Sequence, residues 1–306
     1  MIIIDYSQLI IAGALSFKSD FDKGKSANKQ IDIMRHTIIS TILADKVRFG
    51  KEYGDVVLAV DDRNYWRREI FPHYKANRKK HRESSNTDWT AIFEIGKQLR
   101  AELSEVMPWK FVVAAGAEAD DVIAVLTKYT QTNDLVGGGL YGGEPQRVLI
   151  KSSDGDFGQL HKFDNVRQWS PLTKKYVAKY SKTDLLEKIM TGDTGDGVPN
   201  IKSADDFFVN EDTARQRSIT AKLKEQAFTQ LSKFNAFEFI DFGDSTMNRN
   251  FDRNRSLIDF DYIPKNISDS IVETYINTKP NTTKGKIFDY FVQNRCKLLL
   301  ERIQEI

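Results

Sequence analysis

The sequence predicts an α/β protein with a mainly parallel sheet flanked by helices, followed by an all-helical domain. Short continuous apolar runs alternate with helix-length segments through the first 180 residues, which is typical of parallel strands buried on both faces. After Ser181 the strand signals fade and helical patterns continue. The 306 residues suffice for two ordinary domains. We therefore expect an α/β domain at residues 1–180 and a helical domain at residues 181–306.

The elements of both domains can be assigned in chain order. The strands are expected at residues 2–5, 56–61, 111–115 and 148–153, with helices between them at 30–49, 88–106 and 119–130. Residues 168–180 should add a hairpin or edge strand, and the glycine-rich stretch 133–145 a flexible surface loop. The second domain should contain helices at 182–190, 213–231, 268–277 and 285–301.

The composition excludes several classes of protein. A single cysteine, Cys296, rules out a disulfide framework and a Cys-based zinc site, and four scattered histidines argue against a His-rich one. There is no run of 18 apolar residues, and the short apolar stretch 9–15 lacks the basic start of a signal peptide. We therefore expect a cytosolic protein. The net charge of +2 gives no hint of a charged partner.

Acidic residues follow each predicted strand at its carboxyl end. Asp5 ends the first strand, Asp61 ends the second and Asp154 follows the fourth. If these strands are neighbours in a parallel sheet, their carboxyl ends form one crevice, which is where open α/β sheets bind ligands. The expected crevice set is Asp5, Asp61, Glu118, Asp120, Asp121, Asp154 and Asp156, and the glycine-rich segment 192–198 adds Asp193 and Asp196.

Two interpretations of these carboxylates compete. Acids often cap helices, and Glu118, Asp120 and Asp154 all stand where a helix could begin. However, seven carboxylates in one crevice would repel one another, and a divalent cation removes that conflict. An all-oxygen set favours Mg²⁺ or Mn²⁺ over zinc, and its size suits two ions. No EF-hand spacing occurs, so we favour a magnesium centre.

A strongly basic segment begins directly after Asp61. It holds eight bases and one acid, a local charge of +7 that leaves −5 on the rest of the chain. Aromatic residues interleave with the bases, as in proteins that pair phosphates with Lys or Arg and stack bases on rings. Such a run is usually a solvated helix, but its start beside the acidic crevice favours a metal-dependent phosphodiesterase. The bases are Arg63, Arg67, Arg68, Lys75, Arg78, Lys79, Lys80 and Arg82, and the aromatic residues are Tyr65, Trp66, Phe71 and Tyr74.

The motifs that carry these residues resemble those of the flap endonuclease or 5′→3′ exonuclease family. Four acidic motifs match: "IIIDYSQ" at 2–8, "VVLAVDD" at 56–62, "EADD" at 118–121 and "SSDGDFGQL" at 152–160. "YWRREIFPHYKANR" at 65–78 resembles the arch of the family, and "GDTGDGVPN" at 192–200 resembles the start of its helical DNA-binding motif. "LIDFDYIPKNI" at 257–267 is shared with the T-even bacteriophage branch.

The resemblance implies a PIN-like 5′-nuclease fold and a two-metal Mg²⁺ phosphodiesterase, with Mn²⁺ as a substitute. The implied activity is that of an exonuclease and flap endonuclease that hydrolyses RNA–DNA hybrids and 5′ ends of duplex DNA. It would remove RNA primers from lagging-strand fragments in phage DNA replication. One ion would be held by Asp5, Asp61, Glu118, Asp120 and Asp154, the other by Asp156, Asp193 and Asp196, and Asp121 could serve either.

The resemblance also implies how nucleic acid is held. An arch at about residues 62–88 would admit a single-stranded 5′ end, and Lys75 and Arg78 would act with the catalytic Asp120 and Asp154 on the scissile phosphate. The family's glycine-rich hairpin, often built around K⁺, is replaced by "VPNIKSADDFF" at 198–208, which leaves K⁺ binding open. The remaining expected contacts are Arg63, Arg67, Arg68, Tyr74, Lys79, Lys80, Arg82 and Lys202.

The implied partners are 5′ flaps, nicked or forked duplex DNA and RNA–DNA hybrids. A monomer in the host cytoplasm is the family expectation, and contacts with a sliding clamp or a single-strand-binding protein are left open.

Three other functions are compatible with part of these features. A haloacid-dehalogenase-like phosphatase also gathers acids at strand ends, but its D-x-D-x-T signature needs an Asp where Ser7 stands. A PIN-like ribonuclease would share the acidic crevice but typically lack the arch and the helical domain. A structure-specific DNA-binding protein with weak catalysis would gain nothing from nine carboxylates facing phosphates without metal.

Overall fold

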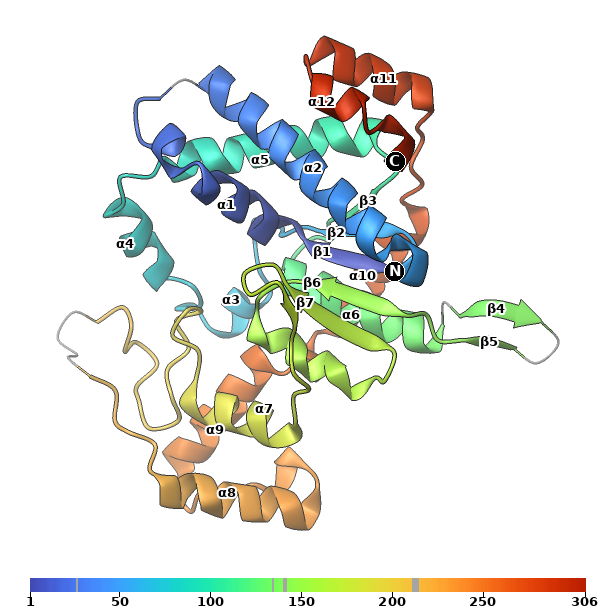
Figure 1. Ribbon diagram of the computed structural model, residues 1–306. Coiled ribbons are helices and arrows are strands. Elements are labelled where there is room, and N and C mark those ends of the chain that lie inside the picture. The colour runs from blue at the N-terminus through green and yellow to red at the C-terminus, as the bar shows by residue number, and fades with distance from the viewer. Residues whose placement is uncertain (26, 134, 140–141, 211–214) are drawn as a thin grey trace. The chain divides into compact units, whose positions relative to one another are not determined.

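The computed structural model describes residues 1–25, 27–133, 135–139, 142–210 and 215–306, with only the backbone at residues 27–28, 80–81 and 138–139. The chain forms two compact units, and Figure 1 labels their helices and strands. Unit 1 comprises Met1–Arg63, Ser85–Val177 and Lys265–Ile306, and unit 2 comprises Asn64–Ser84 and Ala178–Pro264. No helix of the described ranges is long and apolar enough to cross a membrane.

A six-stranded sheet in the order β3-β2-β1-β6-β7-β8 forms the centre of unit 1. Its strands are β1 (Ile2–Asp5), β2 (Val56–Ala59), β3 (Lys110–Val112), β6 (Val148–Lys151), β7 (Val166–Ser170) and β8 (Lys175–Tyr176). All neighbouring pairs are parallel except β7 with β8, which form the predicted hairpin. The four predicted strands are confirmed as neighbours, so their carboxyl ends meet at one edge.

Helices α1 (Tyr6–Ser16), α2 (Ala27–Tyr53) and α5 (Trp89–Val106) pack together in unit 1, and α6 (Ala119–Thr132) follows β3. The helices expected at 30–49, 88–106 and 119–130 are confirmed, with α2 longer at both ends. Helix α1 has no counterpart among the predicted elements. Its sequence, YSQLIIAGALS, spreads apolar residues around the helix instead of along one stripe, so its helical periodicity is weak.

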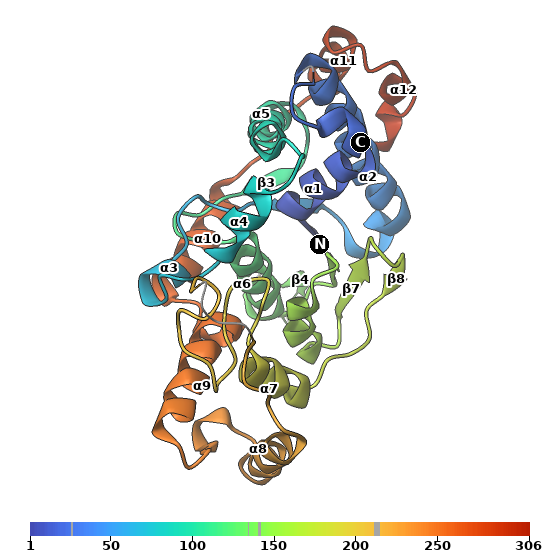
Figure 2. The same ribbon diagram turned by 90° about the vertical axis from the view of Figure 1, so that its left-hand side faces the viewer.

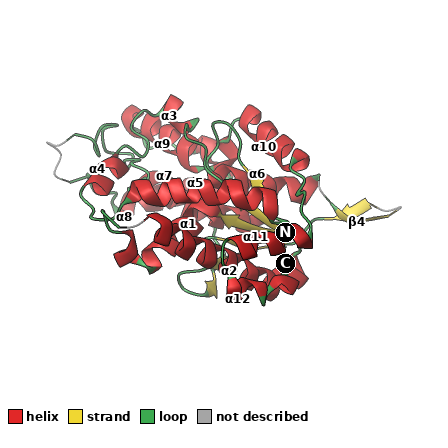
Figure 3. Cartoon of the chain, turned by 90° about the horizontal axis from the view of Figure 1, so that it is seen from above, coloured by secondary structure: helices red, strands yellow, loops and turns green. Residues whose placement is uncertain are grey.

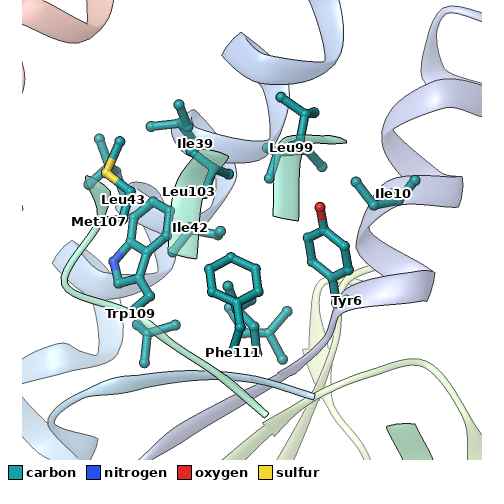
Figure 4. Close-up of a cluster of buried hydrophobic side chains, with 14 of the residues drawn as sticks. Tyr6, Ile10, Ile39, Ile42, Leu43, Leu99, Leu103, Met107, Trp109 and Phe111 are labelled. Carbon is teal, nitrogen blue, oxygen red and sulfur yellow. The ribbon is translucent and has the colours of Figure 1, made fainter. Parts of the chain in front are cut away.

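Figure 4 shows the buried cluster that joins these helices to the sheet. The rings of Tyr6 and Phe111 meet edge to face at 5.6 Å between centroids, and the Tyr6 hydroxyl donates to the Gly96 carbonyl at 2.7 Å. A Cβ on Gly96 would lie 3.2 Å from a methyl carbon of Ile10, so glycine lets α1 and α5 approach closely. Burial of each large apolar side chain contributes about 1.5–3 kcal/mol. The other labelled members are Ile39, Ile42, Leu43, Leu99, Leu103, Met107 and Trp109.

The last 42 residues join unit 1 instead of the expected helical domain. Helix α10 (Lys265–Asn277) lies beside α6 (Figure 2), while α11 (Lys284–Gln293) contacts α5, and α12 (Lys297–Leu300) contacts α2. Phe291 and Leu299 are fully buried in the same core as the sheet. The expected helical domain at 181–306 is therefore corrected, because its last part belongs to unit 1. Helical periodicity predicts that a helix has an apolar stripe, but it does not predict which core that stripe packs against. The helix expected at 285–301 is divided at Arg295, where φ is +54°.

Unit 2 contains α3 (Arg67–Ile70), α4 (Asn77–Glu83), α7 (Lys182–Thr191), α8 (Ala221–Phe234) and α9 (Ser245–Ile258). Helix α7 packs against α8 and α9, and Phe71 and Tyr74 share their core. The expected arch segment therefore belongs mostly to this unit. Helix α9 was missed because few of its residues are apolar, and α8 begins at Ala221 instead of residue 213, which lies outside the described residues.

The flexible loop predicted at residues 133–145 is corrected, because part of this stretch forms two strands. Strands β4 (Val136–Gly139) and β5 (Gly142–Glu144) pair antiparallel and project from unit 1 (Figure 3). Gly137 and Gly142 have φ of +71° and +83°, which a side chain would strain. Short 3₁₀ helices complete the chain at Lys18–Phe21, Gly155–Lys162, Phe237–Phe239, Phe260–Tyr262 and Ile303–Glu305.

Candidate metal centre and nucleic-acid interface

Seven of the nine predicted acids lie on segments that leave one edge of the unit 1 sheet. Asp5 ends β1 and pairs in register with Ala59 of β2, while the preceding Ile4 pairs with Lys151 of β6. Asp61 therefore follows β2 on one side of Asp5, and Asp154 follows β6 on the other. The segment after β3 begins α6 with the three acids Glu118, Asp120 and Asp121.

Asp61 joins the ends of three elements. Its Oδ1 accepts the Ala119 backbone N–H at 2.8 Å, and its Oδ2 accepts the hydroxyl of Ser7. The next residue, Asp62, accepts the Gly116 N–H at 2.8 Å and so holds the turn before α6. Sequence reasoning missed Asp62, although the paired acids of "VVLAVDD" were visible. These contacts attach the end of β2 to the beginnings of α1 and α6.

The structure confirms the helix-capping interpretation for Asp154, which caps the 3₁₀ helix Gly155–Lys162, and for Glu118. Glu118 acts together with Asp121, which that interpretation did not include. They form a capping box, in which the Glu118 N–H donates to Asp121 Oδ2 at 3.0 Å. Both side chains are buried, with residue exposures of 1% and 0%. Asp120, between them in sequence, is partly exposed. The capping box therefore fixes the helical turn that carries Asp120.

Asp154 is the most exposed of the crevice acids. Its Oδ1 accepts the Asp156 N–H at 2.9 Å, and its Oδ2 accepts no hydrogen bond from any described residue. On the neighbouring strand, Asp5 Oδ1 accepts the Gln8 N–H at 2.9 Å. Asp154 thus presents one carboxylate oxygen to solvent at the carboxyl edge of the sheet.

The acids at this edge offer carboxylate oxygens, which are the donors that hard divalent ions prefer. Among the described residues, no group of three or more His, Cys, Asp or Glu side chains stands close enough to hold a metal ion directly. The carboxylates bind neighbouring N–H groups instead, as the contacts of Asp5, Asp61 and Asp154 show. Mg²⁺ usually keeps several waters and takes only one or two carboxylates, so oxygen donors of this kind suit it.

Asp193 and Asp196 lie in unit 2, after α7. Asp193 Oδ2 lies 2.9 Å from Lys188 Nζ, and the Asp193 backbone pairs with Val198 across the glycine-rich turn. Its Oδ1 accepts the Asp196 N–H at 3.1 Å. The structure therefore gives both acids of "GDTGDGV" a defined position within this unit.

Asp196 brings together the bases that sequence analysis assigned to the scissile phosphate. Its carboxylate accepts hydrogen bonds from the Tyr74 hydroxyl at 2.7 Å and Arg78 Nη2 at 2.6 Å, and Lys75 Nζ lies 3.7 Å away. Burial alone would raise the pKa of Asp196, but the charges of Lys75 and Arg78 and the Tyr74 hydroxyl hold that pKa below its ordinary value. Lys75 adopts φ of +57°, a left-handed backbone, and its N–H donates to the Asp196 carbonyl at 2.7 Å.

Several residues expected to contact nucleic acid directly are buried. Arg67 is 3% exposed, donates to the Leu257 carbonyl at 2.8 Å and lies 4.5 Å from the Trp66 ring centroid. Tyr74 is also 3% exposed, as is Phe71, so the interleaved rings mainly pack in the core of unit 2 instead of stacking on bases. The expected direct contacts of Arg67 and Tyr74 with nucleic acid are therefore corrected. Closely spaced aromatic residues are also typical of a hydrophobic core, and in this segment they form part of one.

The remaining predicted bases are accessible to different degrees. Lys75, Arg78 and Lys202 are partly exposed, and the side chain of Lys80 lies outside the described part. Arg63 belongs to unit 1 and the others to unit 2. The exposed members are Arg63, Arg68, Lys79 and Arg82.

A basic pocket in unit 2 adds residues that sequence reasoning missed. Its volume is about 940 Å³, and Lys202, Arg215, Arg217 and Arg249 line it together with Asp205 and Asp206. Sequence analysis predicts only Lys202 among these bases, because the three arginines lie outside the basic segment at residues 63–82. The pocket carries more positive than negative groups, so it can attract a polyanion.

Two asparagines hold residues 200–203, which lie within the segment 198–208 that is expected to stand in place of a glycine-rich hairpin. Asn250 Nδ2 donates to the Ile201 carbonyl at 2.9 Å and to the Ser203 carbonyl at 3.1 Å. Asn200 Oδ1 accepts the Lys202 N–H at 2.9 Å. Two carbonyls that could otherwise face a monovalent ion are therefore already bonded to a buried amide.

Fold and site together define an α/β protein with an acidic strand-end edge in one unit and a basic pocket in the other. The family model of the 5′-3′ exonuclease N-terminal resolvase-like domain matches residues 2–190, and the model of the T4 RNase H C-terminal region matches residues 180–306. Ribonuclease H of Enterobacteria phage T4 is 36% identical over 310 residues, covering 99% of this chain and 94% of the relative. This chain therefore belongs to the 5′-3′ exonuclease family of nucleases, in the branch of the T4 ribonuclease H.

More distant relatives agree with this assignment. Flap endonuclease Xni of Shewanella sp. strain ANA-3 is 28% identical over 152 residues, covering 46% of this chain and 49% of the relative. The solved structure of T5 5′-exonuclease with bound zinc ions has a TM-score of 0.59 at 17% identity, covering 91% of this chain and 99% of that one. At that identity the structural likeness supports the fold.

Proposed function

We propose that this chain is a Mg²⁺-dependent 5′ nuclease that hydrolyses RNA–DNA hybrids and the 5′ ends of duplex DNA. The observation that carries the proposal is the parallel order β3-β2-β1-β6, which brings seven carboxylates to segments at one edge of unit 1. A nuclease needs cations there, because both the phosphodiester and the developing leaving group are negatively charged. The similarity to T4 ribonuclease H across the whole chain supports the hybrid and flap substrates.

The acids of the crevice have different proposed roles. Asp5, Asp61, Asp120 and Asp154 would contribute oxygens to the first ion, since each is at least partly exposed. Buried Glu118 and Asp121 would hold the first turn of α6 through their capping box. Asp156 would support a second ion, partly through waters. When bound, the ions would lower the pKa of an attacking water and stabilise the leaving 3′ oxygen.

Lys75 and Arg78 are the proposed contacts to the scissile phosphate. The Asp196 carboxylate lies 3.7 Å from Lys75 Nζ and accepts a hydrogen bond from Arg78 Nη2 at 2.6 Å. A phosphate oxygen has the same charge sign as this carboxylate, so substrate would compete for cations that are already oriented. Exposed Arg63, Arg68, Lys79 and Arg82, together with Lys202, would bind more distant phosphates.

The biological role proposed from this activity is removal of RNA primers from lagging-strand fragments in the cytoplasm of a phage-infected host. The protein would act as a monomer on flaps and on nicked or forked duplexes. A sliding clamp or a single-strand-binding protein would be its protein partners. The names of the T4 and Shewanella relatives support the substrates.

Cleavage of a 5′-labelled flap and of a nicked RNA–DNA hybrid, with and without Mg²⁺, tests the proposal. We expect cleavage of both substrates only with Mg²⁺. Asp120→Asn should abolish cleavage while leaving binding and thermal unfolding unchanged, because Asp120 is partly exposed and the capping box remains. The matched control is Asp289→Asn, an exposed acid on α11. Tight binding without Mg²⁺-dependent cleavage by the wild type would show a DNA-binding protein instead.

A further inference from the structure

Two glutamine side chains hold the backbone of the turn that presents Asp154. This turn, Ser152–Asp154, follows β6 at the carboxyl edge of the sheet. Gln8 Oε1 accepts the Ser153 N–H at 2.8 Å. Gln168 Nε2 donates to the Ser152 carbonyl at 3.0 Å and to the Asp154 carbonyl at 2.6 Å. The turn is thereby bound from both sides by amide groups of other elements.

The orientation of each amide is determined by its partners. A backbone N–H can only donate, so Gln8 must present its oxygen to Ser153. Backbone carbonyls can only accept, so Gln168 must present its nitrogen to the two carbonyls of the turn. Gln8 therefore acts as an acceptor and Gln168 as a donor, and a carboxylate could replace only the first.

Gln168 is a polar residue at a buried position, which packing alone does not explain. It lies on β7, opposite Ile150 of β6, and is 1% exposed. Its Oε1 is buried and has no hydrogen-bond partner among the described residues. A buried polar atom without a partner is costly, and an apolar residue would avoid that cost. The two hydrogen bonds from Nε2 to the turn are the compensating interaction.

Gln8 connects the same turn to Asp5, the carboxylate that ends the adjacent strand β1. It lies in the first turn of α1, directly beyond β1, and its N–H donates to Asp5 Oδ1 at 2.9 Å. Its side chain then reaches Ser153. One residue thus links the carboxylate that ends β1 to the turn that presents the exposed carboxylate after β6.

We propose that Gln8 and Gln168 are positioning residues that hold the Asp154 carboxylate ready for a divalent cation. This inference rests on the proposed function, since it assigns them to the same metal centre. Asp154 is exposed, and its Oδ2 accepts no hydrogen bond from the described residues, so its direction depends on the backbone that carries it. Groups that orient a metal ligand commonly change metal affinity about 10- to 100-fold when removed.

The opposite hydrogen-bonding roles of the two amides give a selective test. Gln168→Glu removes the donor and places a carboxylate beside two carbonyl oxygens, so it should weaken Mn²⁺ binding about 10- to 100-fold. Gln8→Leu removes the acceptor and should act in the same direction. Gln8→Glu keeps an acceptor and should restore most of the affinity that Gln8→Leu loses. Gln131→Glu is the matched control, because Gln131 also donates to a backbone carbonyl but lies at the end of α6.

Two measurements made without substrate test whether the glutamines position Asp154. Mn²⁺ binding to the metal-free full chain is followed by paramagnetic resonance or calorimetry, and hydrogen exchange at the Ser153 amide reports whether the turn is held. Both Gln8→Leu and Gln168→Glu should accelerate exchange at Ser153, while Gln131→Glu leaves it unchanged. Thermal unfolding of each variant separates local release of the turn from unfolding of the chain.

The outcomes distinguish this inference from the proposed function. Wild-type Mn²⁺ affinity in Gln168→Glu and Gln8→Leu, both folded, would overturn the positioning role even if the wild type cleaves its substrates. Equal loss in Gln8→Leu and Gln8→Glu would also overturn it, because acceptor chemistry would then be irrelevant. If Gln168→Glu does not fold, the two variants at partly exposed Gln8 carry the test. A third outcome is that the variants exchange faster at Ser153 but the wild type neither binds Mn²⁺ nor cleaves any substrate. The glutamines would then hold the turn, but both the proposed function and the role of the cation in this inference would be rejected.

Discussion

Replacement of Lys151 by Met should destabilise unit 1 by about 3–5 kcal/mol, because it leaves a buried carboxylate without its counter-charge. Lys151 ends β6, and its Nζ lies 2.5 Å from Asp45 Oδ1 of α2. The two side chains are only 8% and 10% exposed. Asp45 Oδ2 is buried and has no hydrogen-bond partner among the described residues, so Lys151 is the main compensation for this charge.

The same pair predicts how the loss should depend on pH. Burial raises the pKa of Asp45 above its ordinary value of 3.8, although Lys151 and Arg48 oppose this. The folded protein therefore binds this proton more tightly than the unfolded chain does, so the associated stability is present at low pH and is lost as pH rises through the folded pKa. Without Lys151 the pKa rises further, and the destabilisation should be greater at pH 8 than at pH 5.

Urea unfolding followed by circular dichroism at both pH values measures the effect. The double variant Asp45→Leu with Lys151→Met removes both charges and should unfold within about 1 kcal/mol of the wild type. The matched surface control is Lys265→Met, whose partner Asp269 is 63% exposed, and it should lose less than about 1 kcal/mol. A loss below about 1 kcal/mol for Lys151→Met at pH 8, or an equal loss at both pH values, would refute the reasoning.

Other predictions concern the C-terminal segment, the modified loop and the basic segment. Phe291→Ala should destabilise unit 1 by about 3–5 kcal/mol in urea unfolding, whereas exposed Phe288→Ala should change little, because only Phe291 is buried in its core. K⁺ in place of Na⁺ should leave duplex affinity unchanged, because Asn250 already bonds two carbonyls of the segment 200–203; a K⁺-dependent gain in filter binding would contradict this. Lys75→Ala should lower kcat more than it raises KM, and an effect on KM alone would make Lys75 a docking residue.

The parallel sheet was predictable because its signals are local. Strands β1, β2, β3 and β6 are continuous apolar runs, and parallel strands buried on both faces require such runs. Because the carboxyl ends of neighbouring parallel strands meet, the acids that follow them could be assigned to one edge from the sequence. Helix α1 escaped prediction because its apolar residues form no stripe of helical period, and α9 because few of its residues are apolar.

The sequence by itself determined the fold class, the acidic edge and the family of this protein, because strand patterns and motif order are properties of the chain. Tertiary structure decided which residues share a core, because the apolar stripe of a helix does not identify the element against which it packs. It placed the last 42 residues with the sheet and buried Arg67 and Tyr74. It also joined Asp196 to Lys75 and Arg78, and Gln8 and Gln168 to one turn, because such contacts depend on distances in space between residues far apart in the chain.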